Sequence, residues 1–120
     1  QSKLEIIPTG YLLIDGGKET AVQRVSQTLP IEQDNIELAY KTAKAGEFLG
    51  KKLIYLEAGS GANQHVSLEM VQYVAQNIDV PLIVGGGIRS MTTIQDIYSA
   101  GADLVVIGTA FENDHNFFSI

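Results

Sequence analysis

The chain has 120 residues, enough for one domain, and its 45% of hydrophobic and 18% of charged residues indicate a folded core rather than a disordered segment. It contains no cysteine, which excludes disulfides, thiolate catalysis and the common cysteine-based zinc sites. The net charge of −6 argues against nucleic-acid binding, so any phosphate must be held locally by backbone amides. Because no apolar run approaches the ~18 residues of a membrane span and no signal peptide is visible, we expect a soluble, cytoplasmic protein.

Four segments are predicted to be strands, because each is rich in β-branched or aromatic residues and ends at or beside glycine. Their near-continuous apolar character is typical of a parallel sheet buried on both faces, rather than of half-exposed antiparallel strands. The predicted strands are residues 4–14, 52–58, 81–85 and 103–108.

Three predicted helices alternate with these strands and give the order β, α, β, α, β, α, β. The helices begin near residues 35, 67 and 90 and end near residues 49, 77 and 100. Asp34 or Asn35 can cap the first helix and Ser90 the third, while Gly50 and Gly101 are plausible stops. Residues 18–33 fit less well, and we predict a long loop that contains a turn of helix.

Four parallel strands with three crossovers leave two apolar edges and too few helices to cover both faces of the sheet. A complete (β/α)₈ barrel has about 250 residues. We therefore expect that residues 1–120 form a single domain that is a fragment of a larger barrel. A half barrel that dimerises and a small doubly wound sheet are the alternatives.

The most specific motif is GGGIRS at residues 85–90, placed where a buried strand ends and a helix begins. Glycines there let the backbone approach a phosphate, and the helix start contributes free N–H groups. The next predicted strand also ends in glycine, at Gly108-Thr109. Since the loops after the last two strands of (β/α)₈ enzymes often form one phosphate site, this pair of motifs predicts phosphate binding. The alternative is that the glycines only make tight turns.

The second motif is YLEAGSGA at residues 55–62. Tyr55 and Glu57 are two apart on a strand and therefore share a face, while Leu56 points the other way. If that face lines the barrel interior, Glu57 can accept a hydrogen bond from a substrate hydroxyl or act as its general base, with Tyr55 beside it. The alternative is a strand-end pair that is exposed to solvent or neutralised by a neighbouring lysine.

Weaker candidates have ordinary structural explanations. Arg89 could contact phosphate or lie on the surface. His65 and His115 lack metal-ligand spacing and are expected at the surface. Asp15, before two glycines, suggests turn chemistry, and Met70 is expected in the core.

Several stretches resemble the geranylgeranylglyceryl phosphate synthase family, namely LIYLEAGSGA (53–62), PLIVGGGIRS (81–90) and GADLVVIGTAFE (101–112). The stretch GYLLIDGGKETAV (10–22) and residues 28–31 are similar to that family too. The resemblance spans nearly the whole chain and corresponds to the C-terminal half of the family's modified (β/α)₈ barrel.

What the resemblance implies is transfer of a polyprenyl group, geranylgeranyl in particular, from its diphosphate to the C3 hydroxyl of sn-glycerol 1-phosphate, in ether phospholipid synthesis. Glu57 would hold or deprotonate the glycerol hydroxyl, and Tyr55 would line the same pocket. Further residues that would border the glycerol phosphate or hold its phosphate are Ala58, Gly59, Ser60, Gly61, Gly86, Gly87, Ser90, Gly108 and Thr109.

The resemblance also implies Mg²⁺, which assists the leaving diphosphate. In the family its acidic ligand comes from the first strands, so we expect no metal ligand in these residues and no catalysis by the isolated half. We expect a homo-oligomer. Two alternatives stay open: another phosphate-binding barrel, such as an isomerase or a flavin-dependent enzyme, and a non-catalytic half barrel.

Overall fold

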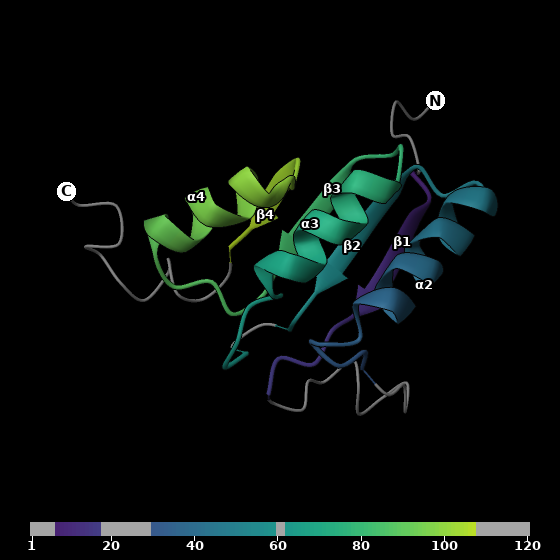
Figure 1. The fold of residues 1–120 in the computed structure, drawn as a ribbon. Helices are drawn as coiled ribbons and strands as arrows, with labels where there is room; N and C mark the ends of the chain where they lie inside the picture. The colour runs from purple at the N-terminus through teal and green to yellow at the C-terminus, as the bar shows by residue number, and fades with distance from the viewer. Residues whose placement is uncertain (1–6, 18–29, 60–61, 108–120) are drawn as a thin grey trace, which may run out of the picture.

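The computed structural model describes residues 7–17, 30–59 and 62–107, and these form an alternating α/β fold (Figure 1). The elements are β1 (Thr9–Leu13), α2 (Ile36–Phe48), β2 (Leu53–Glu57), α3 (Leu68–Asn77), β3 (Leu82–Gly85), α4 (Met91–Ala100) and β4 (Leu104–Val106). The predicted order of four strands and three helices is confirmed, although the strands are shorter than predicted. Residues 18–29, which carry most of the predicted loop, lie outside the described residues.

The four strands form one parallel sheet in the order β1-β2-β3-β4. Tyr11 of β1 is in register with Tyr55 of β2, and Glu57 is in register with Gly85 of β3. Because every strand runs the same way, the segments that follow β1, β2 and β3 meet at one edge of the sheet. That edge carries the residues predicted to bind substrate.

All three helices lie on one side of the sheet, and Figure 1 shows α2 and α3 across it with α4 beside α3. Each strand is added on the same side of its predecessor, so right-handed crossovers place every helix on the same face. A doubly wound sheet needs a reversal of strand order, which the described strands do not have. That alternative is therefore wrong.

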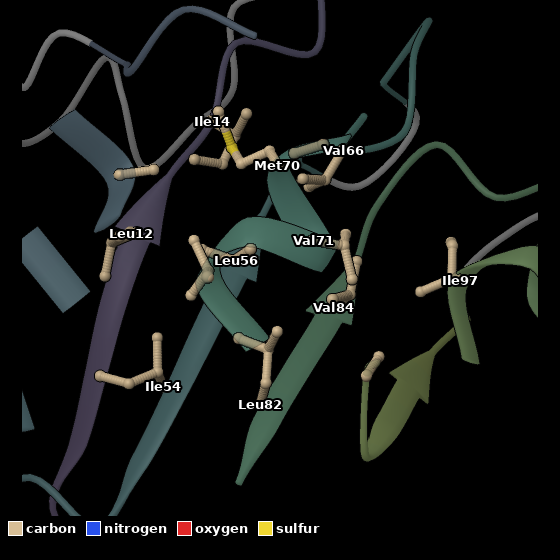
Figure 2. Packing of buried hydrophobic residues seen from close by; sticks show 14 of the residues in the cluster. Leu12, Ile14, Ile54, Leu56, Val66, Met70, Val71, Leu82, Val84 and Ile97 are labelled. Carbon is tan, nitrogen blue, oxygen red and sulfur yellow. The ribbon is translucent and has the colours of Figure 1, made fainter. Parts of the chain in front are cut away.

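The core lies between the sheet and these helices (Figure 2). Alternate strand residues such as Leu56 and Val84 are buried and pack against α3 residues such as Val71. The small residues Ala39 and Ala43 of α2 are fully buried, as a helix in close contact with a sheet requires.

The opposite face of the sheet is open among the described residues. The side chain of Tyr11 is 69% exposed and that of Leu104 is 50% exposed. The three crossovers leave this face without a helix, which confirms that the chain has too few helices to cover both faces. Burial of both faces, typical of a complete barrel, stays a prediction. Tyr55 and Glu57 lie on this open face.

The helix ends confirm most of the predicted signals. The Asn35 side chain, rather than that of Asp34, accepts a hydrogen bond from the Leu38 N–H at the start of α2. Ser67 and Ser90 cap α3 and α4 in the same way. Gly101 follows α4 with a φ of 124°, which favours glycine at that stop.

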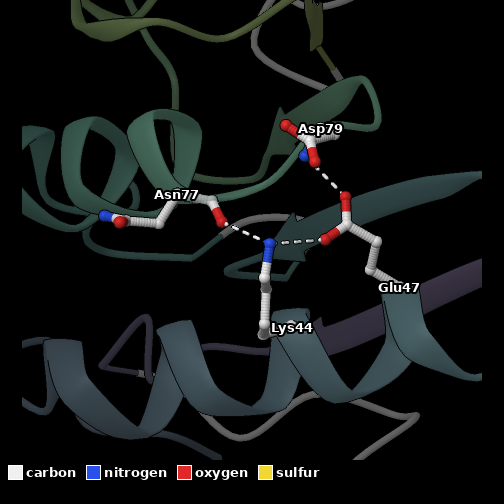
Figure 3. Close-up of polar contacts among 4 residues, drawn as sticks. All are labelled: Lys44, Glu47, Asn77 and Asp79. Atoms are coloured by element: carbon white, nitrogen blue, oxygen red, sulfur yellow. Dashed lines mark hydrogen bonds and ion pairs between the residues drawn. The ribbon is translucent and has the colours of Figure 1, made fainter.

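A polar cluster ties the end of α2 to the end of α3 on the outer surface (Figure 3). The Lys44 ammonium lies 2.8 Å from the Glu47 carboxylate and donates to the Asn77 carbonyl oxygen at 3.0 Å. The Asp79 N–H donates to the other Glu47 oxygen. The hydrogen bond to Glu47 raises the pKa of Lys44, and the same bond lowers the pKa of Glu47.

Within the described ranges, none of the helices is long and apolar enough to cross a membrane.

Candidate functional site

The candidate site lies where β2 ends, on the open face of the sheet. Tyr55 and Glu57 are half-buried there and close to one another, which confirms that they share a face. One Glu57 oxygen, Oε2, accepts a hydrogen bond of 3.0 Å from the Gly59 N–H. That bond fixes the direction of the carboxylate and leaves Oε1 beside the Tyr55 hydroxyl. In the described part of the chain no lysine is bonded to Glu57, and the alternative of a solvent-exposed pair stays open because Glu57 lies on the uncovered face.

Gly85 creates the space in which these two side chains meet. A Cβ at residue 85 would lie 2.7 Å from the Tyr55 hydroxyl oxygen and 3.3 Å from Glu57 Oε1. Both distances are shorter than an ordinary van der Waals contact. The first glycine of the GGGIRS motif therefore leaves room for the Tyr55 hydroxyl and the Glu57 carboxylate.

The Tyr55 ring is positioned from the other side by Tyr11. The two rings stack with centroids 4.9 Å apart and an interplanar angle of 20°. Burial is the main cause that raises the pKa of Tyr55, followed by the negative charge of the nearby Glu57 carboxylate. Tyr55 therefore keeps its proton at neutral pH and can act as a hydrogen-bond donor.

Gly86 and Gly87 have φ values of 94° and 71°, and they bring the segment after β3 against the segment after β2. A Cβ on Gly86 would lie 2.6 Å from the Gly59 nitrogen, and one on Gly87 would lie 2.6 Å from the Gln64 carbonyl oxygen. The glycines thus have a packing role of their own. Their predicted phosphate contacts stay a prediction.

The start of α4 uses the Ser90 side chain as its cap. Ser90 Oγ accepts from the Thr93 N–H at 3.1 Å and lies 2.9 Å from Thr93 Oγ1. Arg89 is exposed and lies at the limit of hydrogen bonding, 3.5 Å from the Gly87 carbonyl oxygen. The free N–H groups at this helix start adjoin the glycines, as a phosphate site requires.

The other predicted residues are confirmed, differently placed, or outside the described ranges. The Asp15 carboxylate accepts from the Gly17 N–H at 2.8 Å, which confirms turn chemistry, and Met70 is buried in the core. His65 is half-buried rather than at the surface, and its Nδ1 lies 2.7 Å from the Val66 carbonyl oxygen. The residues that lie outside the described ranges are Ser60, Gly61, Gly108, Thr109 and His115.

Gln33 is the residue at this edge that the sequence did not single out. Its side-chain amide donates to the Asp15 and His65 carbonyl oxygens and accepts from the Ser67 N–H. A polar residue just before a helix carries no distinguishing sequence signal, and its partners are 18 to 34 residues away.

A metal site was not predicted in this chain. Among the residues that the structure describes, no three His, Asp or Glu side chains are grouped to hold a metal ion.

A family model described as the PcrB family matches residues 1–119. The geranylgeranylglyceryl phosphate synthase of Flavobacterium johnsoniae is 60% identical over 118 residues, which cover 98% of this chain and 49% of that protein. The enzyme of the same name from Zunongwangia profunda is 64% identical over 110 residues, which cover 92% of this chain and 47% of that protein.

A solved structure is similar as well. The (S)-3-O-geranylgeranylglyceryl phosphate synthase of Thermoplasma acidophilum, crystallised with its substrate sn-glycerol-1-phosphate, matches with a TM-score of 0.88 and 40% identity. The match covers 97% of this chain and 46% of that one. The chain thus spans about half the length of the relatives it matches, and the predicted half (β/α)₈ barrel is confirmed. With nearly every residue matched by the family model, this chain belongs to the PcrB family.

Proposed function

We propose that the protein containing these residues is a prenyltransferase. It transfers a polyprenyl group, geranylgeranyl in particular, from its diphosphate to the C3 hydroxyl of sn-glycerol 1-phosphate, in ether phospholipid synthesis. The observation that carries the proposal is the Glu57 carboxylate, held by the Gly59 N–H on one oxygen and adjoining Tyr55 on the other. The proposal is also supported by two relatives named geranylgeranylglyceryl phosphate synthase, which are 60% and 64% identical to this chain.

Glu57 acts on the acceptor hydroxyl in this proposal. The C3 oxygen of glycerol phosphate forms a bond to C1 of the prenyl chain, and the bond between C1 and the diphosphate oxygen breaks. The leaving diphosphate keeps that electron pair, and the hydroxyl proton passes to Glu57. Since Oε2 already accepts the Gly59 N–H, Oε1 is the oxygen available for the proton. The Tyr55 hydroxyl, which stays protonated, donates a hydrogen bond to an oxygen of the acceptor.

The phosphate of the acceptor is held by main chain next to this pair. Gly86 and Gly87 present their backbone at the start of α4, where unpaired N–H groups and the helix dipole favour an anion. A net charge of −6 makes such local donors necessary, because the overall field repels an anion. The further residues proposed for this subsite are Ala58, Gly59, Ser60, Gly61, Ser90, Gly108 and Thr109.

Mg²⁺ belongs to the proposal as the ion that neutralises the leaving diphosphate. The described part of the chain groups no three acidic or histidine side chains for it, so no step above depends on the ion and its ligands are proposed to come from other strands of the barrel. A cytoplasmic location and self-association remain predictions.

The test is Glu57→Gln in the full-length protein, with a radiolabelled prenyl diphosphate and glycerol 1-phosphate as substrates. Loss of a positioned base lowers kcat by roughly 10²- to 10⁴-fold. Affinity for glycerol phosphate should change little, because the amide keeps the shape of the carboxylate. Glu37→Gln, at an exposed position in α2, is the matched control and should retain full activity. Equal turnover of Glu57→Gln and the parent protein would remove Glu57 from the reaction.

A further inference from the structure

The Gln33 side chain joins three segments that are distant in the sequence. Its Nε2 group donates to the Asp15 carbonyl oxygen at 2.9 Å and to the His65 carbonyl oxygen at 3.0 Å. Its Oε1 accepts from the Ser67 N–H at 2.8 Å. The side chain is half-buried, and all three partners are main-chain groups. One amide thus links the segment after β1, the segment after β2 and the start of α3.

Only an amide can satisfy these partners. Two carbonyl oxygens require two N–H donors, and a backbone N–H requires an acceptor on the same side chain. Glutamate would keep the acceptor for Ser67 but would turn an oxygen toward the carbonyl oxygens of Asp15 and His65. Methionine has nearly the same length and offers no strong donor or acceptor. Substitution of Gln33 by glutamate or by methionine therefore removes the donors alone or the donors and the acceptor together.

The segment held by Gln33 forms one wall of the proposed glycerol phosphate site. Its described parts are Gly59, whose N–H donates to the Glu57 carboxylate, and residues 62–67, which end at Ser67, held by Gln33. The Gly59 nitrogen lies so close to Gly86, and the Gln64 carbonyl oxygen so close to Gly87, that neither glycine can carry a Cβ. A shift of this segment would therefore change the distance between the two main-chain walls of the site.

The same segment is fixed to the turn after β1. The Asn63 and Gln64 N–H groups donate to the Gly16 carbonyl oxygen at 2.8 and 3.0 Å, and the Asn63 side chain donates to the Gly17 carbonyl oxygen at 3.0 Å. A Cβ on Gly16 would collide with the Ala58 carbonyl oxygen. The Gln33 side chain extends the contact between these two segments to the start of α3, because it is hydrogen-bonded to the main chain of Asp15, His65 and Ser67.

We propose that Gln33 is a positioning residue for the acceptor half of the site. Its contacts are all with main-chain groups, and it sets the position of residues 62–67 against the glycines that follow β3. This inference rests on the proposed function, since it names the glycerol phosphate subsite as the part that Gln33 supports. It predicts different effects on the two substrates, because all three contacts of Gln33 are with the main chain of the segments after β1 and β2.

The experiment uses the full-length protein and the variants Gln33→Glu and Gln33→Met. The KM for glycerol 1-phosphate and the KM for the prenyl diphosphate are measured separately, at a temperature at which circular dichroism shows each variant to be folded. Misplacement of a binding wall should raise the KM for glycerol 1-phosphate by roughly 10- to 100-fold in both variants. The KM for the prenyl diphosphate and kcat should stay within about twofold of the parent values. Gln72→Glu, an exposed position on α3, adds the same charge as a control and should match the parent.

Three results would overturn the inference. An unchanged KM for glycerol 1-phosphate in a folded Gln33→Glu protein would show that the wall does not need Gln33. An equal rise in both KM values, or failure of both variants to fold at any temperature, would make Gln33 a general structural residue. A parent protein that neither binds glycerol 1-phosphate in calorimetry nor transfers the prenyl group would instead refute the proposed function.

Discussion

Tyr11 and Tyr55 stack across the pair β1 and β2, with ring centroids 4.9 Å apart, and backbone register places them directly opposite each other. The Tyr11 ring covers the Tyr55 ring on the open face of the sheet, and the Tyr11 side chain is itself 69% exposed. Tyr55 in turn lies beside the Glu57 carboxylate. The orientation of the proposed donor therefore depends on an aromatic contact from the neighbouring strand.

Truncation of Tyr11 should weaken this arrangement. Tyr11→Ala removes the stack, and aromatic pairs contribute about 0.5–1.5 kcal/mol beyond their buried area. We expect a loss of that size in the free energy of unfolding, measured by urea denaturation, with a fall in kcat/KM. Tyr11→Phe keeps the ring and is the matched control. A Tyr11→Ala protein with the stability and activity of the parent would show that the stack does not position Tyr55.

Gly85→Ala should disturb the site without straining the backbone. Gly85 lies in β3 and has no positive φ, so the cost comes from the new methyl group, 2.7 Å from the Tyr55 hydroxyl oxygen. Overpacking of this kind costs about 1–3 kcal/mol. Removal of the hydroxyl in Gly85→Ala/Tyr55→Phe should recover much of that loss in a double-mutant cycle of unfolding free energies. Purely additive effects would mean that residue 85 does not contact Tyr55.

Gly86 and Gly50 offer a matched pair, because both have a φ of 94°. Around Gly50 there is no other atom within 4 Å of a new Cβ, whereas at Gly86 the Gly59 nitrogen lies 2.6 Å away. Alanine at either position brings the left-handed strain of about 1–2 kcal/mol. Only Gly86→Ala adds a collision between main-chain segments, so it should lower the urea midpoint well beyond Gly50→Ala. Equal midpoints would contradict the close packing of the segments after β2 and β3.

The cluster of Lys44 and Glu47 should contribute pH-dependent stability. The lowered pKa of Glu47 means that its contribution is present above the usual value of 4.5 and is lost as pH falls through the lower folded value. The raised pKa of Lys44 means that its contribution is present below 10.5 and is lost as pH rises through the higher folded value. Glu47→Gln should flatten the acid side of the profile of melting temperature against pH. Equal dependence of melting temperature on acid pH in Glu47→Gln and the parent protein would contradict the linkage.

The strand pattern and the helix caps could be predicted because they depend on local sequence. Apolar runs that end at glycine marked β1 to β4, and Ser67 and Ser90 occupy the cap positions that their side chains favour. The shared face of Tyr55 and Glu57 followed from the two-residue period of a strand. Each of these features is set by residues a few positions apart.

Features that depend on the order of strands could not be predicted in the same way. The shortage of helices predicted an uncovered face, but that Tyr11 lies on it depends on the side of the sheet that the crossovers take. The role of Gln33 depends on partners as far away as Ser67. The packing role of Gly86 depends on the position of Gly59, which only the sheet brings near.

The contact of Gly86 with Gly59 leaves no space for a side chain at residue 86, so this part of the proposed phosphate site is formed by peptide groups. Peptide groups offer the same donors and acceptors whatever the residue, and this wall can recognise an anion without distinguishing what the anion is attached to. Discrimination among acceptors must then come from side chains, such as the Tyr55 and Glu57 side chains that meet beside Gly85. Changing the acceptor by protein engineering should therefore begin on β2 and leave the glycines unaltered.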